Sequence, residues 1–393
     1  MSGTLYLAWR YVAYHRLKSL ILIGSITLIL YVPVGLRVLV DQSSQQLASR
    51  AAATPLVVGA RGSALELVLN TLYFRADWPT PITHAAVDRV AATGQATAIP
   101  IYARFQSRGF PIVGTSLEYF DFRELEVAHG RQMAMLGEAV VGARVAEQLE
   151  VAPGDSVISS PESVFDVAGV YPLKLNVVGV LPYVDGPDDD AIFVDVRTTW
   201  IIEGIGHGHQ DLAQPEAARD VLSREDDQIV ANAAVVQYNE ITADNIESFH
   251  FHGDISGFPL TAVIAVPPDQ RSSTMLQGRY QADDEPLQIT RPHEVMDELM
   301  ATVLTIERFV VAGAVVVGLA TLATAVLVFL LSLRLRRREI ETLFKIGGSR
   351  SAVALITGAE VIVVLVASVA LAGSLTLLTS QFGGLIIRAW IRA

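Results

Sequence analysis

Three long apolar runs dominate the pattern of hydrophobic and polar positions along the chain. Residues 20–36 and 309–333 carry no charged side chain, and residues 352–378 carry only Glu360. A helix needs about 20 apolar residues to cross the ~30 Å hydrocarbon core of a bilayer. The pattern therefore predicts three transmembrane helices, over residues 19–40, 309–333 and 351–378.

The first apolar run is also open to interpretation as a cleaved signal peptide. Arg10, Arg16 and Lys18 precede it, and small residues at 51–53 offer a cleavage site. However, the apolar run is longer than the usual length of about 7 to 15 residues, and the small residues lie well beyond its end. We therefore expect an uncleaved anchor, preceded over residues 1–18 by a cytoplasmic interfacial helix, with a plain cytoplasmic cap to the first span as the alternative.

Charge asymmetry predicts the orientation of these helices. Residues 1–18 hold three bases and no acid, and residues 334–350 hold six bases against two acids, so both are expected in the cytoplasm. Residues 41–305 then lie outside, with 37 acids, 16 bases and a net charge of −21. This acidity argues against nucleic acid as a partner. The chain has no cysteine for disulfides, but the segment is long enough to bury its own core.

Two helices are expected to carry the external segment as a stalk. Residues 41–54 predict an outward continuation of the first span, which ends at Thr54-Pro55. Residues 291–308 predict the return helix, where apolar residues recur at heptad spacing, typical of helices that pack side by side. An amphipathic helix packed on its own domain is the alternative. The residues of the predicted seam are Met296, Leu299, Val303 and Ile306.

Residues 55–290 are predicted to form an α+β domain. Short β-branched runs bounded by Gly, Pro or Asp indicate strands, residues 80–93 and 137–150 look helical, and residues 204–225 look like a polar surface insertion. The expected fold is therefore an α-helical membrane protein of about three spans with a large α+β periplasmic domain on a helical stalk. The predicted strands lie at 56–59, 98–102, 111–113, 164–170, 175–180 and 191–194.

The basic loop at 334–350 has the pattern of an amphipathic contact helix. Apolar residues share one helical face, charged residues line another, and a double glycine ends the segment. A topology signal that touches only lipid phosphates would explain the arginines but not the apolar face. We therefore expect a partner protein to dock here. The predicted docking residues are Arg337, Arg338, Glu339, Ile340, Glu341, Leu343, Phe344, Lys345, Gly347 and Gly348.

Known catalytic motifs are missing from the sequence. A nucleotide-binding P-loop needs a lysine directly after glycine, but Lys18, Lys174 and Lys345 follow Leu, Leu and Phe. The chain is therefore not expected to be an enzyme or to hold a cofactor of its own. Glu360 is costly inside a span unless it faces other helices, so we expect either a structural interhelical role or a coupling role.

Two His-x-His pairs lie in the external segment. The pairs are His207 with His209, and His250 with His252. Alternate residues of a strand point to one face, and imidazoles on one face are suitable ligands for Zn²⁺ or Cu²⁺. Solvated histidines in a glycine-rich loop are the alternative interpretation.

Several segments resemble FtsX-like and MacB-type ABC transporter permeases. Residues 338–349, REIETLFKIGGS, resemble the loop that follows the second span of these permeases and docks on the ATPase. Residues 112–116, 130–131, 138–146, 153–155 and 177–180 resemble, in order, the MacB-type periplasmic core domain.

The resemblance implies a permease in the bacterial inner membrane that works by mechanotransmission. A separate cytoplasmic ATPase dimer would bind ATP and Mg²⁺, and a second permease copy, identical or different, would complete the transporter. A periplasmic lipoprotein, adaptor or substrate-delivery protein is a further implied partner. The alternatives are a non-transporting, FtsX-like relay that activates a periplasmic partner, and a periplasmic metal-binding sensor on a permease scaffold.

The C-terminal end departs from the family's usual four spans. Residues 379–393 are too few and too basic to cross the membrane, so we expect a short interfacial tail there. Trp390 would anchor this tail at the headgroup level, and a fourth helix donated by a partner is the alternative.

Overall fold

The structure is a computed structural model of the 393-residue chain, and the described residues divide into two compact units. Residues 1–47 and 298–393 form the helical unit, and residues 48–297 form the α/β unit. Residues outside the description are 1–5, 7–8, 11, 75–78, 161–171, 209–220, 226–227, 232–237, 283–284, 336, 346, 348 and 393.

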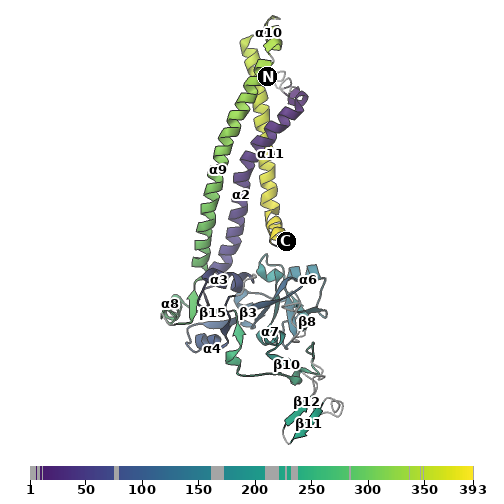
Figure 1. Cartoon of the computed structure of the whole chain (residues 1–393), viewed down its shortest axis with the longest axis vertical. Coiled ribbons are helices and arrows are strands. Elements are labelled where there is room, and N and C mark those ends of the chain that lie inside the picture. The colour runs from purple at the N-terminus through teal and green to yellow at the C-terminus, as the bar shows by residue number, and fades with distance from the viewer. Residues whose placement is uncertain are drawn as a thin grey trace. The chain divides into compact units, whose positions relative to one another are not determined.

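The helical unit contains the three predicted spans (Figure 1). Long, almost uncharged runs of Leu, Val, Ile and Ala form helices because a helix satisfies its backbone hydrogen bonds internally. Their outer side chains are exposed, for example Phe309 at 75%. The helices are α2 (Arg16–Ala52), α9 (Pro292–Leu335) and α11 (Arg350–Arg392), with the short α10 (Arg337–Lys345) between the last two.

The helix boundaries differ in detail from those predicted. α2 runs through the predicted span and outward stalk without a break, and α9 does the same for the return stalk and second span. α11 continues past residue 378 to Arg392, so the helix does not end where we expected a separate tail. The interfacial position of residues 379–393 stays a prediction.

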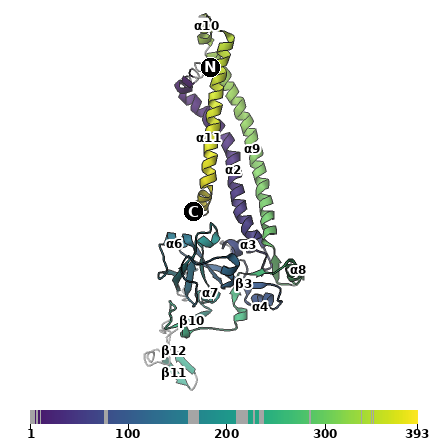
Figure 2. The same cartoon turned by 180° about the vertical axis from the view of Figure 1, so that it is seen from behind.

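Polar side chains join α2 and α11, which lie side by side and run in the same direction (Figure 2). The hydroxyl of Thr27 donates to the carbonyl of Ser368 at 3.3 Å. The hydroxyls of Tyr31 and Thr379 are 2.8 Å apart, and the Gln42 amide donates to the carbonyl of Ser380 at 2.9 Å. Such hydrogen bonds between spans hold helices together where the hydrophobic effect between them is weak.

The α/β unit is built on a mixed sheet that confirms most of the predicted strands. Among the described residues the sheet has ten strands in the order β16-β1-β15-β3-β4-β9-β6-β8-β5, with β7 paired to β8. The β4–β9 and β6–β8 pairs are parallel, and the other pairs are antiparallel. The strands are β1 (Leu56–Ala60), β3 (Thr97–Ser107), β4 (Phe110–Thr115), β5 (His129–Gly130), β6 (Glu138–Val141), β7 (Ser156–Ile158), β8 (Lys174–Val180), β9 (Ile192–Asp195), β15 (Ala262–Val266) and β16 (Leu287–Thr290).

Smaller elements surround this sheet. Within the described part of the chain, three two-stranded ladders pair β2 (Ile82–Thr83) with β14 (Pro259–Leu260), β10 (Gly206–Gly208) with β13 (Phe249–Phe251), and β11 (Val221–Glu225) with β12 (Gln228–Ala231). The short helices are α3 (Ala64–Tyr73), α4 (Ala85–Ala91), α5 (Glu118–Arg123), α6 (Ala143–Leu149), α7 (Val196–Ile202) and α8 (Gln270–Gly278).

One sequence expectation for this unit is wrong. The segment 137–150 is not one helix, because its first part is strand β6, whose four residues are buried in the sheet. The two adjacent valines favour a strand, and Gly142 in an extended conformation separates it from α6. The segment 204–225, expected as a polar surface insertion, contributes strands β10 and β11, and because residues 209–220 lie outside the described residues its surface position stays a prediction. The predicted strand at 164–170 lies outside the described residues.

Candidate functional site

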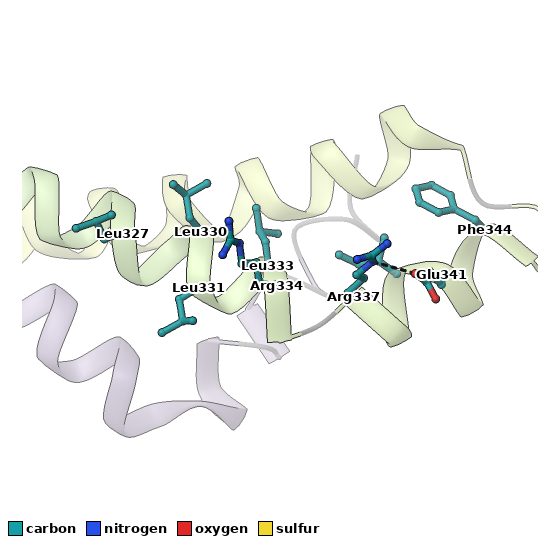
Figure 3. A pocket seen from close by; sticks show the side chains of 9 residues that line it. Leu327, Leu330, Leu331, Leu333, Arg334, Arg337, Glu341 and Phe344 are labelled. Atoms are coloured by element: carbon teal, nitrogen blue, oxygen red, sulfur yellow. Dashed lines mark hydrogen bonds and ion pairs between the residues drawn. The ribbon is translucent and has the colours of Figure 1, made fainter.

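The predicted contact helix forms α10 and borders a groove with the end of α9 (Figure 3). The groove has a volume of about 720 Å³, with leucines and Arg334 on the α9 side and both apolar and charged side chains on the α10 side. Arg337 Nε donates to Glu341 Oε1 at 3.1 Å along the exposed face of α10. The lining residues are Leu327, Leu330, Leu331, Leu333, Arg334, Arg337, Ile340, Glu341 and Phe344.

The rest of α10 agrees with an exposed amphipathic helix. Phe344 is 40% exposed, a high value for an aromatic side chain, while Ile340 is half-buried. Arg338 and Lys345 are exposed. The chain turns at Gly347, whose φ of +93° only glycine adopts easily, and this confirms the expected helix end. Gly348 and the side chains of Glu339 and Leu343 lie outside the description.

The predicted stalk residues differ in burial along α9. Met296 is fully buried, Leu299 and Val303 are half-buried, and Ile306 is 59% exposed. Glu307, next to Ile306, is instead buried, which the heptad pattern did not indicate. Stalk packing along the whole seam stays a prediction.

Glu360 lies inside α11 and is only 4% exposed. A carboxylate at this depth is costly unless it faces protein or water, so its burial agrees with the expected inward orientation.

The structure brings three of the four predicted histidines together. His207, His250 and His252 have ring centroids 4.9 Å apart in each pair, and their possible ligand atoms all lie within 4.8 Å of one another. The cluster takes one histidine from the first pair and two from the second. His209 lies outside the described residues.

A buried charge cluster at the last turn of α2 was not predicted from the sequence. The Arg50 guanidinium donates to both carboxylate oxygens of Asp188, at 2.6 and 2.9 Å, to the Tyr119 hydroxyl at 2.8 Å and to the Leu72 carbonyl at 2.6 Å. The Tyr119 hydroxyl donates to Asp188 at 2.7 Å. Burial opposes the charge of Asp188, but Arg50 and Tyr119 outweigh it and lower the pKa of this carboxyl below its usual value.

The run of three acids around Asp188 is the only sequence signal that could have indicated this cluster. Arg144 donates to Asp189 at 2.9 Å and to Asp190 at 2.8 Å, so each acid of the run pairs with an arginine. Asp189 also accepts from the backbone N–H groups of Val184 and Gly186. The three acids therefore form ion pairs with arginines inside the α/β unit and do not make an acidic surface.

Comparison with known proteins assigns the family. The chain matches the MacB-like periplasmic core domain over residues 20–239, which is more than half its length. It therefore belongs to this family and is an FtsX-like, MacB-type ABC transporter permease, as the resemblance in the sequence indicated. Permeases of this class are not themselves the ATPase, and the family implies an ATPase partner.

Two solved structures show a distant likeness. The extracellular domain of the noncanonic ABC-type transporter YknZ from Gram-positive bacteria is 12% identical, with a TM-score of 0.33, over 60% of this chain and 98% of that one. The periplasmic region of MacB from Actinobacillus actinomycetemcomitans is 9% identical, with a TM-score of 0.36, over 66% and 97%. The assignment rests on the family match and not on these scores. No curated protein sequence matches the chain.

Proposed function

We propose that this permease couples a separate cytoplasmic ATPase to movement of its periplasmic domain, for export or extraction of a substrate by mechanotransmission. The observation that carries the proposal is α10, an exposed helix with apolar and charged faces between two membrane spans. Its groove offers Phe344 and the leucines of α9 to an apolar side chain, while Arg337 and Arg334 lie at the same groove for an acidic one.

The proposed docking places α10 in the cytoplasm at the ATPase surface. An exposed aromatic at the centre of a contact is the kind of residue that contributes most to binding, typically about 2–4 kcal/mol on truncation. The basic residues around it suit an acidic rim on the ATPase and speed association. The same basic residues support a cytoplasmic position for this end of the helical unit, in an inner membrane.

The test compares two substitutions that add the same charge to opposite faces of α10. Phe344→Asp places the charge in the groove, and Thr342→Asp places it on the exposed opposite face. We expect Phe344→Asp to weaken ATPase binding by roughly 30-fold or more and Thr342→Asp to have little effect. The measurement is recovery of the ABC ATPase with the full-length permease, together with ATP hydrolysis in nanodiscs. Equal ATPase recovery with Phe344→Asp would contradict the docking proposal.

A further inference from the structure

The β10–β13 ladder places aromatic and histidine side chains on opposite faces. Its register pairs Gly206 with Phe251, His207 with His250, and Gly208 with Phe249. Each phenylalanine lies directly over the opposite glycine, where an added Cβ would approach the ring to 2.6 Å. Only glycine leaves this space, so the two phenylalanines share one face. Side chains alternate along a strand, and the histidines therefore share the other face.

The aromatic face anchors the ladder to the core of the α/β unit. The Phe251 ring lies 6.3 Å from the buried Trp200 and 5.9 Å from Phe258. The Trp200 indole N–H donates to the carbonyl of Pro259 at 2.8 Å. The backbone that carries the histidines is thus held by core packing rather than by a free loop, which favours a preformed site.

The three imidazoles are arranged as a nearly equilateral triangle. Zn–N bonds of about 2.0–2.1 Å in a tetrahedral site place ligand nitrogens about 3.3 Å apart. The nitrogens lie within 4.8 Å of one another, so modest rotation of the rings brings them to this spacing. His252 is exposed and His207 is half-buried, so both solvent access and room for rotation exist.

A backbone contact selects the tautomer of one ring. Nδ1 of His250 lies 3.1 Å from the carbonyl oxygen of Ser248. A carbonyl only accepts, so Nδ1 donates its proton and the lone pair is on Nε2. A histidine oriented in this way by a backbone carbonyl is the usual state of a metal ligand.

We propose that His207, His250 and His252 bind a divalent transition-metal ion, Zn²⁺ or Cu²⁺, in the α/β unit. Three imidazoles suit these ions, and a fourth position is left for water or another ligand. The net charge of −21 over residues 41–305 raises the local concentration of cations. Because the ion would bridge His207 and His250, 43 positions apart in sequence, its binding would link strand β10 to strand β13.

The test uses the full-length permease with a tag that lacks histidine, and Zn²⁺ titrated in competition with a chromophoric chelator. We expect one equivalent of Zn²⁺ bound at micromolar concentration or tighter. His207→Ala and His250→Ala should each weaken binding at least 10-fold to 100-fold, and His129→Ala, an exposed histidine on β5, should not. Affinity should fall on acidification because ligating imidazoles must be neutral.

A second readout separates a specific site from surface binding. Cu²⁺ bound by several imidazoles should give nitrogen hyperfine splitting in its electron paramagnetic resonance spectrum, and His252→Ala should reduce it. Zn²⁺ binding weaker than tens of micromolar in the unsubstituted protein would overturn the proposal. Unchanged affinity in His207→Ala and His250→Ala would overturn it as well.

Discussion

The buried pair of Arg50 and Asp188 is expected to control the stability of the α/β unit. Their side chains are 11% and 4% exposed, so the surrounding water screens the pair weakly. Arg50→Met leaves the Asp188 carboxylate buried, with the Tyr119 hydroxyl as a remaining donor. Removing one partner of a buried ion pair typically costs about 3–5 kcal/mol, a large fraction of the total stability of a domain.

Urea unfolding of the full-length protein in nanodiscs, followed by pulse proteolysis, measures this cost. With a slope near 3 kcal/mol/M, a loss of about 3–5 kcal/mol lowers the urea midpoint by roughly 1–1.7 M. Arg50→Met with Asp188→Leu should recover part of the loss, because the Asp188 carboxylate is then no longer buried without Arg50, while the nearby buried Arg123 loses the favourable charge of Asp188. Arg291→Met is the matched control, since its partner Glu294 is 58% exposed and such pairs contribute about 0–1 kcal/mol. A midpoint for Arg50→Met within ~0.3 M of the unsubstituted protein would refute the reasoning.

Because the folded structure lowers the pKa of the Asp188 carboxyl, its carboxylate stabilises the fold above the unfolded-state pKa of about 3.9, and this contribution is lost as pH falls through the folded-state pKa. Asp188→Asn should remove this acid dependence of the urea midpoint. Gly142→Ala should destabilise by about 1–3 kcal/mol, because its Cβ would lie 2.1 Å from the Asp188 carbonyl, whereas Gly257→Ala, with open space around it, should be nearly neutral in the same assay. A cysteine at Ser44 should react with an impermeant thiol reagent in spheroplasts and one at Ser349 only after the membrane is opened, and the reverse would invert the proposed topology.

The membrane spans, α10 and most strands of the large sheet could be predicted because their signals are local. Apolar runs, alternation and glycine positions depend on neighbours in sequence. The segment 137–150 failed because a short strand followed at once by a helix has no clear period of its own. β6 is a strand through its partners β8 and β9, which come later in the chain.

The features missed are those that depend on tertiary pairing. Arg50 and Asp188 are 138 residues apart, and although Asp188 lies in a run of three acids, nothing in the sequence pairs it with Arg50. The four histidines of the two pairs were predicted together as candidate ligands, but the sequence did not show which imidazoles meet. The register of β10 with β13 sets His207 opposite His250, and no spacing within either pair contains that information.

The hydrogen bonds between α2 and α11 have a mechanical consequence. A single residue separates α9 from α10, and four separate α10 from α11, so a displacement of α10 acts on the ends of both long helices. α9 continues from Met296 of the α/β unit, while α11 is joined through Tyr31 and Gln42 to α2, which ends at the Arg50 cluster. In the proposed docking, a displacement of α10 would therefore reach both chain connections to the α/β unit, one through α9 and the other through α11 and α2.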